Sequence, residues 1–293
     1  MKKNTYILVG VLAILLVIAV ILMNRPGEKN LSADNSHYLF NVDSSAIDKI
    51  TLYSPQSKVT LEKKDGEWFL TEPIAYRADQ SAVALVLHQS RELDVEEVVS
   101  SNPEKRSIFQ VDSTGTAVRL LQGGEERAAF VVGKTGQSYA ETYVRASRSN
   151  DVDLVKGSLS WSFGKSVKDW RDKTIFTVPK ETIRQISYQY PDEKFSAVLQ
   201  DSVWMIGTDK AKVADLSTLL GSLSNVQADD FVDSATIPAP KISATISIGA
   251  TQLRLSEIKG KDSYLVQTSL SPQWFVVQGW RAKQILKHKK DLI

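Results

Sequence analysis

The chain has 293 residues, a formal net charge of +2 at pH 7, 42% hydrophobic and 24% charged residues, and no cysteine. This length favours two compact units over a single core, and the absence of cysteine excludes disulfides, thiolate catalysis and cysteine-based metal sites. Beyond residues 1–29 the chain holds 32 basic and 33 acidic residues. A body so close to neutral disfavours nucleic-acid binding, which needs clustered positive charge.

The chain starts with a short segment, residues 1–5, followed by an uncharged apolar run over residues 6–23. As a helix this run would be about 27 Å long, close to the ~30 Å hydrocarbon core of a lipid bilayer. We therefore expect a single transmembrane helix there. Lys2 and Lys3 precede the run, and the positive-inside rule places them in the cytoplasm. The predicted location is the inner (cytoplasmic) membrane, with the body in the periplasm or extracytoplasmic space.

A cleaved signal peptide is the alternative for this N-terminus. Its apolar region would be about 7–15 residues long and would end at a small-x-small cleavage site. The run here is longer, and Asn24, Arg25 and Pro26 follow it without such a site. We therefore prefer an uncleaved anchor. The polar residues 24–44 are predicted to be a tether.

The rest of the chain has the pattern of one structural unit built twice, over residues 45–175 and 176–293. The segments DGEWFLTEP (65–73) and DSVWMIGTD (201–209) both begin with Asp and have Trp in fourth place, 136 positions apart. The residue pairs with this spacing are Ile47 and Ile183, Ile50 and Ile186, and Trp68 and Trp204. A spacing kept over several elements indicates duplication.

Alternating apolar and polar residues predict antiparallel strands in each unit, as in 46–53 and 58–64. A helix follows, with Asp79 as its expected N-cap and with helically spaced apolar residues. The apolar stripes are Val83, Leu87 and Leu93 in the first unit and Leu216, Leu220, Leu223 and Val226 in the second. The helix-compatible stretches 158–170 and 280–290 close the two units. We interpret the six tryptophans as core anchors.

The predicted fold class is α+β. It comprises an N-terminal single transmembrane helix followed by two tandem repeated units, each mostly antiparallel sheet with packed helices.

No motif predicts catalysis, a cofactor or a metal. The segment VVGKTGQSY (131–139) ends like a phosphate loop, but residue 128, where the first glycine of that loop would stand, is alanine. The three histidines lack zinc-binding spacing. The acidic doublets Glu96-Glu97 and Asp229-Asp230 are interpreted as solvated charges at strand edges. We therefore expect a protein that is not an enzyme and has no cofactor, although carboxylates that meet between the units would revive a hydrolase.

The C-terminal stretch 280–290 is basic, with Arg281 and Lys283 near its start. It is either a terminal helix with cations near its negative dipole end or an amphipathic helix on anionic lipid. We prefer the first interpretation.

Several short motifs together resemble the bacterial domain-of-unknown-function family 4340. They are the N-terminal apolar run, Ile47-x-x-Ile50, Trp68-x-Leu70-x-x-Pro73, Val83 with Leu87, Val132-Gly133-Lys134, Tyr143-Val144-Arg145, Val152-x-Leu154-Val155 and Trp170-Arg171-Asp172-Lys173. The likeness covers residues from about 45 to 290. The second unit departs from it, because Gly207 and Asp209 occupy the region that corresponds to Pro73 and no Gly-Lys directly follows Leu255.

The candidate residues are structural core or family-motif positions. They are Ile47, Ile50, Trp68, Pro73, Gly133, Tyr143, Arg145, Ile183, Ile186 and Trp204. The resemblance implies a single-pass envelope protein associated with ABC-type export systems, including gliding-motility-type transporter components. We therefore expect a non-enzymatic accessory subunit that scaffolds or couples a membrane complex, with ABC-type transporter subunits and the lipid bilayer as partners. The alternative is a periplasmic or surface module that binds a glycan, a lipid or a peptide.

Overall fold

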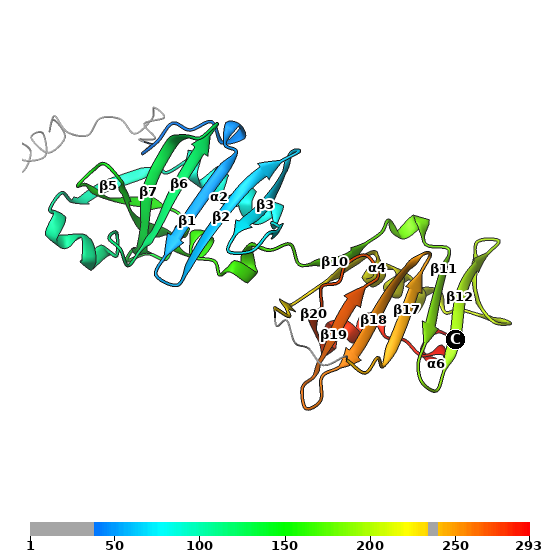
Figure 1. Cartoon of the computed structure of the whole chain (residues 1–293). Coiled ribbons are helices and arrows are strands. Elements are labelled where there is room, and N and C mark those ends of the chain that lie inside the picture. The colour runs from blue at the N-terminus through cyan, green and yellow to red at the C-terminus, as the bar shows by residue number, and fades with distance from the viewer. Residues whose placement is uncertain (1–37, 234–239) are drawn as a thin grey trace, which may run out of the picture. The chain divides into compact units, whose positions relative to one another are not determined.

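The computed structural model of the chain describes residues 38–233 and 240–293 (Figure 1). The predicted transmembrane helix over residues 6–23, together with residues 1–5 and 24–37, lies outside the described residues. Within the described ranges, every helix is too short or too polar to cross a bilayer. Residues Leu39–Ile293 form one compact unit.

The predicted α+β fold class is wrong. The described residues are mostly antiparallel sheet, in two large sheets of nine strands each, and the helices are few and short. The longest described helices are α2 (Gln80–Arg91) and α4 (Val213–Ser224), each with 12 residues. The other helices are α3 (Leu159–Phe163), α5 (Gly279–Ile285) and α6 (Lys289–Leu292).

The closing helix expected over 280–290 is broken because tyrosine side chains bind its backbone. The hydroxyl of Tyr188 donates to the carbonyl of Ile285, and that of Tyr190 donates to the carbonyl of Lys287, both at 2.9 Å. Carbonyls bound in this way leave the helical hydrogen-bond pattern, and the chain turns away between α5 and α6. The stretch 158–170 is likewise divided into α3 and the 3₁₀ turn η3 (Val167–Trp170).

The first sheet has the strand order β4-β3-β2-β1-β6-β7-β8-β9-β5. Its strands are β1 (Lys49–Ser54), β2 (Ser57–Lys64), β3 (Glu67–Glu72), β4 (Tyr76–Arg77), β5 (Val95–Ser100), β6 (Thr116–Gln122), β7 (Glu125–Thr135), β8 (Glu141–Ala146) and β9 (Val152–Lys156). All pairs are antiparallel. One face packs on α2 and α3, and Ile47, Ile50 and Trp68 lie in this core.

The second sheet has the order β14-β13-β12-β11-β17-β18-β19-β20-β16. Its strands are β11 (Gln185–Gln189), β12 (Lys194–Gln200), β13 (Val203–Ile206), β14 (Asp209–Lys210), β16 (Asp230–Phe231), β17 (Ala244–Ile248), β18 (Thr251–Glu257), β19 (Ser263–Thr268) and β20 (Phe275–Gln278). Its core contains Ile183, Ile186 and the apolar face of α4.

Each element of the first sheet has a counterpart in the second. Strands β1–β4 correspond to β11–β14, β5 to β16, and β6–β9 to β17–β20. The backbone contacts also match, since Ala78 N donates to Trp68 O and Ala211 N donates to Trp204 O, both at 2.9 Å. The short strands β10 (Thr174–Thr177) and β15 (Asn225–Gln227) form a separate two-stranded sheet.

The helix starts differ between the units. The carboxylate of Asp79 accepts hydrogen bonds from Ser81 N and Ala82 N and so caps α2. The residue before α4 is Lys212, which provides no side-chain cap. Ser90, on the stripe of α2, is fully buried, and its hydroxyl donates to the carbonyl of Val86 at 2.6 Å.

Two tryptophans, Trp161 and Trp280, do not anchor a core, so the prediction that all six tryptophans are core anchors was wrong for these two. Trp161 is 68% exposed and lies under the ammonium of Lys165, and Trp280 is 57% exposed and lies beside the guanidinium of Arg281. Trp170, in contrast, is fully buried. Apolar contact on one side and a cation on the other suffice to hold an exposed ring.

Candidate functional site

The sequence-predicted residues fall into two groups in the structure. Four of them are buried in the two cores: Ile50 and Ile186 lie within β1 and β11, and Ile47 and Ile183 lie just before these strands. Trp68 is 6% exposed, whereas its counterpart Trp204 is only half-buried. These residues stabilise the sheets by burial of apolar surface.

The second group holds one segment against the first sheet. This segment, 103–111, includes the 3₁₀ turn η2 (Pro103–Phe109). A Cβ on Gly133 would lie 2.3 Å from the carbonyl oxygen of Phe109. The ring of Tyr143 lies 4.8 Å from that of Phe109, and Arg145 Nε donates to the carbonyl of Val111 at 3.0 Å. Gly133, Tyr143 and Arg145 thus act together as a support for one segment.

Within residues 38–233 and 240–293, the guanidinium of Arg145 donates its hydrogen bonds to backbone carbonyls. Its Nη1 reaches the carbonyls of Ala146, Ser147 and Ser149 at 3.2–3.4 Å. Burial, with the neighbouring positive charge of Arg106, lowers the pKa of Arg145 from its usual value. The guanidinium ties the turn after β8 to segment 103–111.

Pro73 is exposed and follows β3, with a cis bond to Glu72. Gly133, Lys134 and Thr135 all lie within β7, so the Gly-Lys-Thr sequence does not open a helix.

The segment Trp170–Lys173 connects the two sheets and brings their residues together. The carbonyl of Trp170 accepts from Asp79 N at 2.8 Å, and Arg171 forms an isolated bridge with Ala78. These contacts fix the connector to the first sheet beside β4. The connector then continues into β10, which pairs with β15 ahead of β16.

Arg171 is the centre of this site. Its side chain is 2% exposed, and its guanidinium carbon lies 4.3 Å from the ring centroid of Tyr76 on β4 and 3.6 Å from that of Phe231 on β16. Nη1 donates to Asp233 Oδ1 at 2.6 Å, and Nη2 reaches Gln273 Oε1 at 3.5 Å. Arginine stacks on aromatic faces and pairs with carboxylates in this manner.

The two rings also contact each other. Tyr76 and Phe231 are arranged edge to face, with centroids 5.5 Å apart. Burial raises the pKa of the Tyr76 hydroxyl from its usual value of 10.0. The Arg171 side chain is 2% exposed, whereas its partner Asp233 is 48% exposed, so the ion pair is buried on the arginine side and reaches solvent on the carboxylate side.

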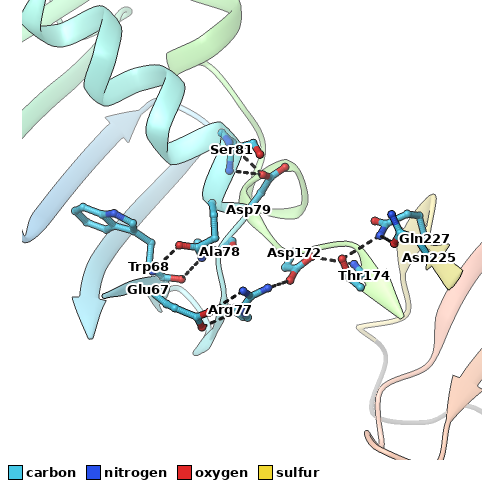
Figure 2. A network of polar contacts seen from close by, with 12 residues as sticks. Glu67, Trp68, Arg77, Ala78, Asp79, Ser81, Asp172, Thr174, Asn225 and Gln227 are labelled. Atoms are coloured by element: carbon cyan, nitrogen blue, oxygen red, sulfur yellow. Dashed lines mark hydrogen bonds and ion pairs between the residues drawn. The ribbon is translucent and has the colours of Figure 1, made fainter. Parts of the chain in front are cut away.

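A second set of contacts lies at the surface of the connector (Figure 2). Arg77 donates to Glu67 through Nε and Nη2, at 3.1 and 2.9 Å, and to Asp172 through Nη1. Asp172 accepts from Thr174 N at 2.9 Å, and Gln227 donates to the Thr174 hydroxyl at 3.0 Å. The hydrogen bond from Arg77 lowers the pKa of Glu67.

A polar cavity of about 560 Å³ lies beside this network and is lined by both basic and acidic side chains. Its cations are already paired: Arg77 with Asp172, Lys173 with Asp169, and Arg281 with Asp229. Among residues 38–233 and 240–293, no three His, Asp or Glu side chains are grouped as metal ligands would be.

The acidic doublets have different surroundings. Asp229 and Asp230 are paired with Arg281 and Lys168 at 3.1 and 2.9 Å. Glu96 and Glu97 on β5 are exposed. The basic C-terminal stretch is largely neutralised by this chain itself, since Lys283 pairs with Asp262 and Lys289 with Asp209.

Trp170–Lys173 was identifiable from the sequence as part of the family resemblance, whereas Tyr76, Phe231 and Asp233 were not among the candidate residues. One difference between the two units was visible in the sequence and indicated two of these residues. Phe231 and Asp233 stand where the first unit has Val98 and Ser100, so an aromatic and an acidic residue replace an aliphatic and a neutral one. That difference pointed to a role that only the second unit has.

Comparison with known proteins and protein families gives one match, to a family model. The family model described as Domain of unknown function (DUF4340) matches residues 68–243. No curated protein and no solved structure matches the chain. Because the matched residues make up more than half of the 293-residue chain and include the connector Trp170–Lys173, the chain belongs to the DUF4340 family.

Proposed function

We propose that the protein is a non-enzymatic accessory subunit that scaffolds or couples a membrane complex outside the cytoplasm. The observation that carries this proposal is the buried Arg171, which contacts Tyr76 from the first sheet and Phe231 from the second. A buried, stacked and ion-paired arginine couples the elements that it contacts more firmly than surface ion pairs do. Two large sheets joined in this way suit a scaffold.

The expected partner is an ABC-type export or gliding-type transport system. This expectation comes from the family resemblance. Attachment to the bilayer is proposed from the uncharged run of residues 6–23 and from Lys2 and Lys3 before it. The inner membrane is the proposed location, with the two sheets in the periplasm or extracytoplasmic space.

The experiment is affinity purification of the full-length, C-terminally tagged chain from detergent-solubilised membranes, followed by mass spectrometry. We expect transporter subunits to be recovered in amounts comparable to the bait. A matched sample of Arg171→Ala should recover less partner, whereas Arg77→Ala, at the exposed network, should recover the wild-type amount. Recovery of no membrane protein with the wild-type chain would contradict the proposal.

Location has its own test. Protease added to intact spheroplasts should digest the two sheets, as it digests a periplasmic control protein. Survival of the sheets under those conditions would place them in the cytoplasm.

A periplasmic or surface binding module is the second candidate function. It is favoured by exposed aromatic rings on the first unit, Trp161 at 68% and Tyr139 at 90% exposed, because such rings stack on sugars and insert among lipids. A glycan and lipid array probed with the full-length chain tests it. Binding that Trp161→Ala abolishes would support this function.

A further inference from the structure

The second unit contains an open apolar groove. The groove lies between β13 and α4, has a volume of about 250 Å³, and is lined by Val203, Trp204, Val213, Leu216 and Leu220 among others. Val213 is 83% exposed and Val203 is 40% exposed. Apolar side chains gathered in an exposed hollow are typical of an interaction site.

In the first unit, Gln80 is at the position that corresponds to Val213 of the groove. Gln80 and Val213 are counterparts, because they are the first residues of α2 and α4. The Gln80 amide accepts from Trp68 N at 2.8 Å and donates to the carbonyls of Trp68 and Ala78 at 2.9 and 2.8 Å. Val213 cannot form these bonds, so the second unit lacks this hydrogen-bonded link between the start of its helix and the strand that contains its tryptophan.

The charge around the groove has changed in the same direction at three positions. Counterparts of Ser44, Glu67 and Asp79 in the second unit are Lys180, Val203 and Lys212. Each change raises the formal charge by at least one. Lys180 donates to the hydroxyl of Ser217 at 3.1 Å, and within the described part of the chain neither Lys180 nor Lys212 has a carboxylate partner.

We propose that this groove binds an apolar peptide segment with acidic residues, contributed by a partner protein. The apolar floor of the groove would bury the aliphatic or aromatic side chains of the peptide. The unpaired ammonium groups of Lys180 and Lys212 would attract its carboxylates and set its orientation. The inference rests on the proposed function in one respect, since the peptide would belong to a subunit of the membrane complex.

The test selects random dodecapeptides displayed on phage against the full-length chain and measures the selected peptides by fluorescence anisotropy. We expect sequences with apolar residues and Asp or Glu. The double variant V203E/V213Q gives the groove polar side chains like those of the first unit and should weaken binding at least tenfold. K180S/K212D should also weaken binding and should reduce its dependence on salt. The matched control L270Q, at a residue 71% exposed elsewhere in the second unit, should bind as the wild type does.

Several outcomes would overturn the inference. These are the absence of any enriched peptide, enrichment of basic peptides, or equal binding by V203E/V213Q. Self-association in sedimentation that V203E/V213Q abolishes would identify a second copy of this chain as the occupant, and vesicle binding that it abolishes would identify lipid. Thermal unfolding checks that the variants fold, and K180S alone replaces any variant that does not.

The two proposals can fail separately. If transporter subunits are recovered but no peptide is selected, the groove proposal fails and the proposed function stands. If peptides are selected but no membrane protein is recovered, the proposed function fails and the groove proposal stands.

Discussion

The guanidinium carbon of Arg171 lies 3.6 Å from the ring centroid of Phe231, so a residue of the connector is stacked on a residue of the second sheet. The same guanidinium is 4.3 Å from Tyr76 of the first sheet. A single side chain therefore contacts both sheets. Its environment differs from that of Arg77, whose side chain is 44% exposed although it forms two ion pairs.

This difference predicts unequal costs for the two arginines. We expect Arg171→Ala to lower the free energy of unfolding by about 2–4 kcal/mol, because it removes a buried guanidinium that stacks on two rings and leaves a cavity between them. Arg77→Ala should cost less than about 1 kcal/mol, since exposed ion pairs contribute little. Urea unfolding followed by circular dichroism measures both. Equal losses would show that burial of Arg171 has no energetic consequence.

The two glycines Gly133 and Gly221 should respond to alanine with opposite signs. A Cβ on Gly133 would collide with the carbonyl of Phe109, so Gly133→Ala should destabilise by about 1–3 kcal/mol and release segment 103–111. Gly221 lies in α4 with nothing within 4 Å of its added Cβ, so Gly221→Ala should stabilise by about 0.5–1 kcal/mol. Thermal unfolding gives the signs. Limited proteolysis within 103–111 tests the release.

The turn between β12 and β13 has a residue that does not suit its backbone. Ser202 has φ +68°, whereas its counterpart Gly66 has φ +86° and is free of Cβ strain. We expect Ser202→Gly to stabilise the protein by about 1 kcal/mol, and Gly66→Ser to destabilise it by a similar amount. Paired unfolding curves of the two variants check this. A loss of stability in Ser202→Gly would contradict the expectation.

Acid should weaken the contact between Asp230 and Lys168. Burial raises the pKa of Asp230, but hydrogen bonds from Lys168 and Phe231 N outweigh it and bring the pKa below the ordinary 3.8. A carboxyl with a lowered folded pKa stabilises above its unfolded pKa, and this contribution is lost as pH falls through the folded pKa. We therefore expect wild type to lose more stability than Asp230→Asn between pH 5 and about pH 2. Urea unfolding at several pH values measures the difference, and parallel curves would contradict it.

Local patterns in the sequence were sufficient for several features. The alternating runs over 46–53 and 58–64 lie in the paired strands β1 and β2, and Asp65 and Gly66 form the turn with positive φ that follows β2. Asp79 is the N-cap of α2, as expected. The family resemblance is confirmed by the match over residues 68–243. Each of these features depends on residues that are close together in the chain or on a short motif that is visible in the sequence.

Local patterns did not predict the structure where contacts with residues distant in the chain determine it. The stretch 280–290 has a helical pattern, but the hydroxyls of Tyr188 and Tyr190 bind carbonyls at its middle and divide it. Trp161 and Trp280 have the apolar size of core residues but lie outside the cores. The fold class was wrong for the same reason, because the extent of each sheet depends on pairing between strands rather than on any one strand.

The sequence by itself determined the alternation that forms strands, the spacing of paired isoleucines and tryptophans, and the charges at the N-terminus. Only the tertiary structure decided that Arg171 meets Tyr76 and Phe231, that Gly133, Tyr143 and Arg145 support one segment, and that the groove beside Val213 is open. The physical reason is the distance along the chain over which each effect acts. Backbone preference and side-chain periodicity act over a few residues, whereas burial and ion pairing depend on which distant residues the fold brings into contact.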